Sequence, residues 1–443
     1  MTENAGHVTD AAAQEGDLLT LSILALLIGA VSGLLGAAFR IAVDWGDRLR
    51  NGLIRVEHHD GLFGLLFFVS LCASACALAA WLVRRYARQA SGSGIPHVEA
   101  VMHGLVPPAA LTLAPVKFFG GMLALGAGLT LGREGPSVQI GAVVAQMIGV
   151  GARRSWADCR LLLAAGAGAG LATAFNAPIA GAVFVLEELA QKFEHRMAIV
   201  ALAASATAIC VSRAIVGDGP IFTVAPIAFV SIAAEPLFIF FGALLGVFAI
   251  IFNRSLLATM FFMEERKRLP VEARAGLIGA GVALAGWYSP MLIGGGDEIV
   301  QQALSGRPLV ALLPFLFLLR LAFLVLSYSG GTPGGIFAPL LALGAQAGLL
   351  FFSACHGLFP QMALEPQSFA LVGMTALFAG VSRAPLTGIV LVTEMTANTT
   401  LLLPMIGASF AAMLVPTLLN NAPIYESLRI KTLQREKADP AQA

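Results

Sequence analysis

The sequence contains few charged residues. Only 12% of its 443 residues are Asp, Glu, Lys or Arg, against about 25% in a typical soluble domain. The formal net charge is +1, so there is no basic excess of the kind that attracts nucleic acids. Hydrophobic residues make up 58%, and the mean hydropathy is +0.83. So few charges cannot cover a water-facing surface. The composition excludes a soluble enzyme and a nucleic-acid binder, and it predicts a polytopic membrane protein.

The residue patterns of enzymes and metal sites are also lacking. The five cysteines form no CxxC pair, and the seven histidines show no metal-ligand spacing. The glycine run Gly294–Gly296 lacks the following Gly-Lys-Ser/Thr of a phosphate-binding loop. Residues 1–17 hold no Lys or Arg, which excludes the basic start of a signal peptide. We therefore expect no enzymatic activity, no cofactor and no metal, and a short flexible tail at 1–17.

Long apolar runs alternate with shorter ones that Gly and Pro interrupt. A membrane-spanning helix needs about 20 apolar residues, and the runs that meet this length are 18–44, 62–83, 109–131, 197–215, 225–252, 272–293, 308–328 and 401–419. The shorter runs are 137–150, 160–174, 178–189, 336–352, 367–381 and 384–394. Short paired runs of this kind are typical of half-helices that meet near the middle of a membrane.

Clusters of basic residues predict which side of the membrane faces the cytoplasm, because such clusters favour the cytoplasmic side. One cluster follows the second apolar run at Arg84-Arg85, and a second lies between Arg266 and Arg274. The third begins at Arg429 in the polar tail. We therefore expect residues 426–443 to form a cytoplasmic C-terminal tail.

The chain contains an internal repeat. Asn176–Glu187 reads NAPIAGAVFVLE, and Arg383–Glu394, 207 residues later, reads RAPLTGIVLVTE. In transporters, such repeats are often inverted relative to each other, with the substrate site between them. We therefore predict an all-α membrane protein with a first repeat at 18–215 and a second at 216–425, built from tilted, broken and re-entrant helices.

Two basic residues recur at matching places within apolar runs. Lys117 stands fifteen residues before Gly132, and Arg320 stands fifteen residues before Gly335. Their side chains can attract anions or pair with acids. The alternative is that they extend along apolar surface and place their charges in the interface.

Three breaks rich in Gly and Pro precede or open apolar runs. They are Gly92-Ser93-Gly94-Ile95-Pro96, Gly132-Arg133-Glu134-Gly135-Pro136 and Gly334-Gly335-Ile336-Phe337-Ala338-Pro339. A helix that starts at such a break has free N–H groups and about half a positive charge at its N-terminus. Several such ends directed at one point make an anion site without Lys or Arg, and they bind weakly enough for conduction. The alternative is that the glycines only allow close helix packing or turns.

Two acids inside apolar runs are candidates for proton chemistry. An unpaired charge at the membrane centre costs about 2.5–3.5 kcal/mol even on lenient scales, so Glu134 needs a stabilising position. At a helix N-terminus it would sit where a permeating anion binds, blocking the path when ionised and opening it when protonated or displaced. The alternative is a simple helix cap. Glu188 is a second candidate, unless it is an ordinary interfacial acid. Glu394 matches Glu187 in the repeat and has a structural interpretation.

In their order, the three breaks resemble those of the CLC family of chloride channels and chloride/proton exchangers. The resemblance runs from about residue 18 to Tyr425, without the cytoplasmic CBS modules of longer members. It implies that chloride is held by the hydroxyls of Ser93 and Tyr425 and by the amides of Ile336 and Phe337. Ser at position 93 matches the members that select chloride.

The same resemblance implies the proton-transfer groups. It makes Glu134 the external gate and proton acceptor, and Glu188 the internal proton-transfer residue. The residues that it implies support the site are Gly92, Gly94, Pro96, Glu99, Lys117, Gly132, Arg133, Gly135, Pro136, Gly335 and Pro339. The sequence departs from the family pattern at His97, where related exchangers often carry an acid, and at the acidic Asp297-Glu298 pair.

We therefore expect chloride transport across the inner (plasma) membrane by a multi-pass protein, as chloride/proton exchange with a glutamate gate. The alternative is a passive voltage-gated chloride channel, and a helical scaffold with vestigial motifs is a third reading. The expected partners are chloride, protons, the lipid bilayer and a second copy of the chain in a homodimer. No nucleic-acid partner is expected.

Overall fold

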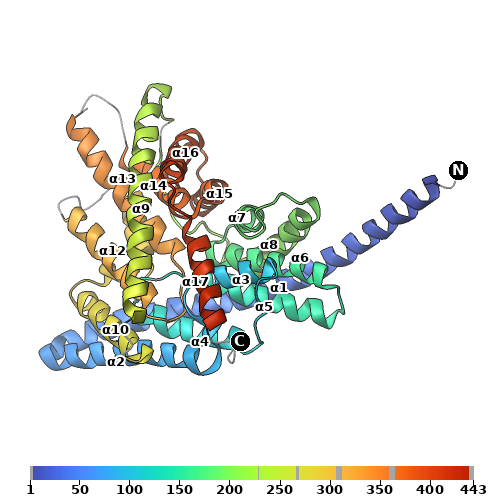
Figure 1. The fold of residues 1–443 in the computed structure, drawn as a ribbon. Helices are drawn as coiled ribbons and strands as arrows, with labels where there is room; N and C mark the ends of the chain where they lie inside the picture. The colour runs from blue at the N-terminus through green and yellow to red at the C-terminus, as the bar shows by residue number, and fades with distance from the viewer. Residues whose placement is uncertain (1–2, 228, 266–268, 306–311, 359–364, 439–443) are drawn as a thin grey trace.

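The fold is all-α in the part of the chain that the computed structural model describes, residues 3–227, 229–265, 269–305, 312–358 and 365–438 (Figure 1). The first repeat contains α1 (Glu3–Glu57), α2 (Gly61–Tyr86), α3 (Ile95–Met102), α4 (Leu113–Gly126), α5 (Glu134–Gly151), α6 (Trp156–Phe175), α7 (Pro178–Phe184) and α8 (His195–Val216). The second contains α9 (Glu235–Glu265), α10 (Val271–Tyr288), α11 (Asp297–Leu304), α12 (Leu313–Ser329), α13 (Phe337–Leu358), α14 (Pro366–Ser382), α15 (Pro385–Thr396) and α16 (Leu402–Leu418). A final helix, α17 (Ile424–Ala438), follows.

The two sets of helices pack in the same way. In the first, α1 packs on α6 and α8, and α5 packs on α6. In the second, α9 packs on α14 and α16, and α13 packs on α14. The all-α, repeated membrane architecture predicted from the sequence is therefore confirmed.

Helix breaks in the repeats follow from local sequence. α6 ends at Asn176 (φ 52°) and α14 ends at Arg383 (φ 67°), both in the left-handed conformation that stops a helix. An Ala-Pro pair comes next in each repeat. Pro178 and Pro385 then begin α7 and α15, because proline fits the first helical turn, where no N–H is needed.

Glu187 and Glu394 occupy equivalent positions in the repeats, and each caps the short helix of the other repeat. Glu187 accepts two backbone N–H bonds, of 3.0 and 2.7 Å, at the start of α15. Glu394 accepts two, of 3.1 and 2.7 Å, from Ile179 and Ala180 at the start of α7. Carboxylates at helix N-termini are stabilised by the free N–H groups and the helix dipole. The two halves of the internal repeat therefore make equivalent side-chain contacts. These contacts agree with a structural role for Glu394.

Glycines let the central helices approach closely. A Cβ built on Gly141 of α5 would lie 2.1 Å from the carbonyl oxygen of Gly166 of α6. In the second repeat, a Cβ on Gly344 of α13 would lie 2.4 Å from the carbonyl oxygen of Gly373 of α14. Small residues at such crossings are how membrane helices gain packing contact. α6 and α14 are consequently buried along almost their whole length.

Helix lengths differ from the predicted runs at several places. Within the described residues, four stretches are long and apolar enough to cross a membrane: 17–86, which covers most of α1 and all of α2, 195–216, 232–265 and 337–358. The run 336–352, expected to be short, belongs to α13, which has 22 residues. The run 109–131, expected to span, contains only the 14 residues of α4. Gly128, at φ +94°, follows the end of that helix, and such a backbone angle does not continue it.

Both ends of the chain differ from a simple tail. α1 begins at Glu3, so the segment expected as a tail continues the first helix, and its flexibility stays a prediction. The C-terminal segment forms α17, which packs on α3 (Figure 1). Of the second basic cluster, residues 266–268 lie outside the described residues.

Candidate anion site and proton-transfer residues

The three glycine-rich breaks meet in space, although they lie far apart in the sequence. Gly92 pairs with Pro333 in a parallel β-bridge, and Gly132 pairs with Gly335 in an antiparallel bridge. The second bridge has two hydrogen bonds, from Gly132 N to Gly335 O (2.9 Å) and from Gly335 N to Gly132 O (2.8 Å). The bridges hold the N-terminal ends of α3, α5 and α13 close to one another.

The four expected chloride ligands are all buried. Ile336, Phe337 and Tyr425 are 0% exposed, and Ser93 is 1% exposed. Within the described part of the chain, the hydroxyls of Ser93 and Tyr425 have no hydrogen-bond partner other than each other. The Phe337 ring lies 5.5 Å from the Tyr425 ring, centroid to centroid. Two buried hydroxyls that can donate to an anion thus lie close together.

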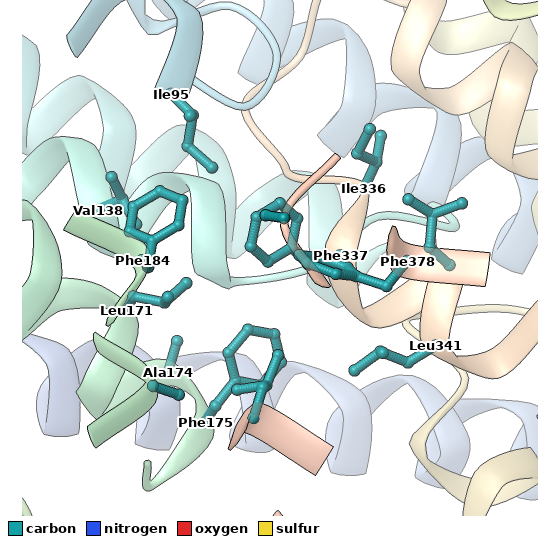
Figure 2. Close-up of a cluster of buried hydrophobic side chains, with 14 of the residues drawn as sticks. Ile95, Val138, Leu171, Ala174, Phe175, Phe184, Ile336, Phe337, Leu341 and Phe378 are labelled. Atoms are coloured by element: carbon teal, nitrogen blue, oxygen red, sulfur yellow. The ribbon is translucent and has the colours of Figure 1, made fainter. Parts of the chain in front are cut away.

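Apolar side chains surround these ligands. Figure 2 shows Ile336 and Phe337 in a cluster with Phe184 and Phe378. The Phe337 ring centroid lies 4.6 Å from that of Phe378 and 5.9 Å from that of Phe184, both in edge-to-face geometry. The aromatic edges carry the positive side of the ring quadrupole. Hydrogen bonds gain strength in such surroundings because the local dielectric constant is low.

Glu134 is the first residue of α5, and its carboxylate lies at the N-terminus of α13. Oε1 accepts a 2.7 Å hydrogen bond from the backbone N–H of Phe337. The side chain is fully buried, and Oε2 has no partner among the described residues. The carboxylate therefore occupies an N–H group that the sequence assigned to the anion site. The carboxylate thus lies between two helix N-termini, that of α13 and that of its own helix, α5.

Glycines make room for this carboxylate. A Cβ on Gly132 would lie 2.0 Å from Glu134 Oε2, and a Cβ on Gly335 would lie 2.2 Å from Glu134 Oε1. A Cβ on Gly135 would lie 2.6 Å from the Ser93 carbonyl oxygen. The glycines of the second and third breaks thus shape the seat of Glu134.

The remaining supporting residues of the breaks set the helix starts. Gly94 adopts φ +84° immediately before α3, where only glycine fits easily. Pro96, Pro136 and Pro339 lie in the first turns of α3, α5 and α13.

Lys117 and Arg320 anchor glycine-rich loops. Lys117 Nζ donates to the carbonyls of Ala90 (3.0 Å) and Gly92 (2.7 Å). Arg320 donates to Leu292 O (3.4 Å) and Gly294 O (3.1 Å). Both side chains are 0% exposed, so neither reaches the interface as the alternative reading had it. Their observed partners are backbone carbonyls.

Arg133 lies at a small cavity of about 50 Å³ that also borders Gly132. Its Nε donates to the Ala174 carbonyl (3.1 Å), and Nη1 donates to Asp44 Oδ1 (3.4 Å). Nη2 lies 4.0 Å from Asp297 Oδ2. Asp297, one of the residues that depart from the family pattern, therefore faces Arg133, the residue directly before Glu134.

A larger cavity of about 560 Å³ borders the first break at Gly92 and Gly94. Arg84 and Arg88 line it, and so does His97, the other departure from the family pattern. The basic side chains give this cavity a positive lining, which attracts anions toward a site of low dielectric constant.

Glu188 lies in a π-helical turn, Val185–Leu189, that follows α7. The turn separates two adjacent acids, since Glu187 reaches α15 whereas Glu188 is buried at 7% exposure. Glu99 is buried at 1% on α3, which packs against this π-helical turn. The two acids therefore lie on neighbouring segments, and their joint role in proton transfer stays a prediction.

Sequence reasoning missed three residues near these groups. The hydroxyl of Tyr328 accepts a 3.4 Å hydrogen bond from the backbone N–H of Ser93. Arg429 forms an ion pair with Glu99, and Gln191 donates to Glu99 Oε1 at 3.3 Å. Arg429 was assigned only to a basic tail, and no motif marks the other two.

The family model described as "Voltage gated chloride channel" matches residues 75–417. Curated relatives include the H(+)/Cl(-) exchange transporter ClcA of Salmonella paratyphi B and that of Salmonella typhimurium. Each is 39% identical to this chain, with alignments that cover 96% of the chain and 91% of the relative.

Solved structures show the same likeness. A slow cyanobacterial Cl-/H+ antiporter superposes with a TM-score of 0.90 at 33% identity, covering 94% of this chain and 99% of that one. A CLC-type fluoride/proton antiporter superposes with a TM-score of 0.78 at 24% identity, covering 92% of this chain and 97% of that one, which supports the fold alone.

Proposed function

Because the chain belongs to the voltage-gated chloride channel family, we propose that it exchanges chloride for protons across the inner membrane. The observation that carries the proposal is the hydrogen bond from the Phe337 amide to Glu134 Oε1, in a buried site that also holds the hydroxyls of Ser93 and Tyr425. The exchangers among its relatives and structural neighbours support it over a passive channel.

Chloride binds at the point where the hydroxyls of Ser93 and Tyr425 and the amides of Ile336 and Phe337 converge. Each donor offers a partial positive charge, and the start of α13 adds the field of its helix dipole. A full cation in the same low-dielectric site would hold the anion much more tightly. Binding by partial charges lets chloride leave as readily as it enters, which turnover requires.

Glu134 gates the site by competition for one donor. The N–H of Phe337 cannot serve the carboxylate and chloride at once, and the two negative charges repel each other. When Glu134 takes up a proton, it loses the charge that holds it at the N-terminus of α13. Chloride then replaces it, so protonation and anion occupancy alternate. Proton binding and chloride binding are coupled because they share one position.

Glu188 supplies protons from the cytoplasmic side. It is buried on the π-helical turn, which packs against α3, the helix that carries Glu99. The proton passes from cytoplasmic water to the Glu188 carboxylate and then to Glu134. A passive channel has no need of a buried internal acid, so Glu188 distinguishes the two mechanisms.

Two copies of the chain associate as a homodimer, for which α7, α8, α15 and α16 provide one of several exposed apolar faces. Large apolar side chains on these helices are exposed, among them Ile179 (52%), Leu202 (50%), Leu386 (60%) and Phe410 (57%). α7 contacts α8 and α15, and α15 contacts α16, so these helices are continuous in space. Each subunit keeps its own ion site, since all the ligands come from one chain.

Purified protein in liposomes tests the exchange. An outward chloride gradient, with valinomycin and potassium setting the voltage, should drive protons uphill. Glu134→Gln and Glu188→Gln should each stop proton movement and leave chloride flux, because an amide cannot carry the proton. Glu298→Gln, an exposed acid with no place in the proposed path, is the matched control. Chloride flux without proton movement in the wild type would support the channel, and loss of all flux in Glu134→Gln would refute gating by competition.

A further inference from the structure

Glu99 is held by two residues that lie far from it in the sequence. Its side chain is almost wholly buried on α3, and Oε1 forms an ion pair with Nη1 of Arg429. The same oxygen accepts a 3.3 Å hydrogen bond from Gln191 Nε2. Oε2 has no partner within the described residues. One oxygen is thus fixed by two donors, while the other is left unpaired inside the protein.

Each partner belongs to a segment that carries a group of the exchange site. Arg429 stands four residues after Tyr425 on α17, one turn further along the same helix face. Gln191 follows the π-helical turn that carries Glu188, and it adopts the left-handed conformation at φ 52°. Glu99 therefore links the helix of an anion ligand to the segment of the internal acid.

The charges in this cluster balance at one proton. Arg429 forms an ion pair with Glu99, and α3, which carries Glu99, packs against the π-helical turn that carries Glu188. Two buried carboxyls and one guanidinium are neutral together when the carboxyls hold a single proton. Without the guanidinium, neutrality needs a proton on both acids. An uncompensated buried charge is costly, so the cation decides how many protons the pair keeps.

Other acids act on the cluster from its edges. Glu187 is next to Glu188, but its carboxylate is bound by the N–H groups that start α15. Glu426 interacts electrostatically with Glu99 and is half-buried on α17. Both add negative charge, which increases the need for a cation at the centre.

We propose that Arg429 is a positioning residue for proton uptake, which keeps Glu99 ionised in an ion pair so that Glu188 takes up and passes on the proton. The proton moves from water to the Glu188 carboxylate and on to Glu134, and neither Arg429 nor Glu99 gains or loses one. This role rests on the proposed exchange. It also places one element, α17, in contact with both the anion site and the proton path.

The test uses the purified full-length protein in liposomes, with chloride and proton fluxes measured together. Arg429→Met removes the charge and keeps a long apolar side chain, whereas Arg429→Lys keeps the charge. Arg196→Met is the matched control, because Arg196 also forms an ion pair, with Asp17 Oδ2 at 2.7 Å, outside the site. The double variant Arg429→Met with Glu99→Gln replaces the acid that the cation serves.

Arg429→Met should lower the number of protons moved per chloride by roughly five-fold or more, with chloride turnover close to that of the wild type. Arg429→Lys and the double variant should restore much of the ratio, and Arg196→Met should leave it unchanged. A wild-type proton-to-chloride ratio in Arg429→Met would overturn the positioning role of Arg429. An equal loss of the chloride and proton fluxes would also overturn it, because it would show a structural effect through Tyr425. If the wild-type protein moved no protons, the proposed exchange would be refuted, and the role of Arg429, which depends on it, would be refuted as well.

Discussion

Replacing Gly132 with alanine should open the gate without touching the gating acid. A Cβ at this position would have three nearest atoms, and all belong to the Glu134 carboxylate, with Oε2 at 2.0 Å. An ordinary contact lies at 3.4 Å or more, so the carboxylate must withdraw by about 1.4 Å, the difference between these two distances. Gly132 does not have a positive φ, so alanine fits its backbone without strain.

The size of the effect follows from the hydrogen bond that the carboxylate loses. A hydrogen bond to a charged group contributes about 1.5–3 kcal/mol, so the loss of the 2.7 Å bond to Phe337 N should lower occupancy of the seat by roughly 10- to 150-fold. Chloride should then hold the site without competition. We expect chloride turnover at or above that of the wild type, with coupled proton flux lowered by about ten-fold or more.

Paired chloride and proton fluxes in liposomes measure this effect. Gly295→Ala is the control. Gly295 lines the same small cavity as Gly132, but a Cβ at Gly295 would lie 3.5 Å from its nearest atom, which is an ordinary contact. Wild-type coupling in Gly132→Ala would refute the reasoning, since it would mean that Glu134 can gate without its seat at α13. Loss of chloride flux in a folded Gly132→Ala protein would also refute it.

Two further predictions concern the mouth and the repeat. Asp297→Asn should lower the KM for external chloride by roughly two- to five-fold at low ionic strength, because it removes one of the two acids that face Arg133 and makes the small cavity beside Gly132 more positive. A KM that stays constant would show that the charge at this cavity does not steer chloride. Glu394→Ala should lower the Tm in detergent, because two N–H groups at the start of α7 lose their acceptor at a cost of about 1–3 kcal/mol each. The Tm of Glu394→Gln should lie between those of the wild type and Glu394→Ala. An unchanged Tm in Glu394→Ala would contradict the capping role.

Apolar runs located the helices but not their lengths, since the run 109–131, expected to span, contains the 14-residue α4, whereas 336–352, expected to be short, belongs to the 22-residue α13. Every run proposed from the sequence overlaps a helix. The eight-residue helices α3 and α11 and the polar α17 were not predicted as elements. They are too short or too polar to give an apolar run, and α3 and α11 start directly after the left-handed glycines Gly94 and Gly296. Element boundaries near Gly and Pro therefore needed the structure.

The breaks located the candidate ligands, but not the partners of the charged side chains. Glycine and proline at fixed spacing are local signals, and they marked the breaks that precede or open α3, α5 and α13. The partners of Lys117 are carbonyls 25 and 27 residues away, and the partner of Arg429 is 330 residues away. Such pairings depend on how whole helices pack, which no local pattern specifies. The sequence left the role of Lys117 open for this reason.

The repeat provides a symmetric frame, and the chemistry lies where the two halves differ. The bridge between Gly132 and Gly335 joins equivalent residues of the two repeats, and two positions further on Glu134 corresponds to Phe337. The first repeat thus supplies the carboxylate, and the second supplies the N–H that binds it. A carboxylate at both positions would bring two like charges to one site, where each opposes the ionisation of the other. A single proton-controlled gate therefore requires that the repeats differ at this pair, while the bridge that aligns the pair requires that they stay the same.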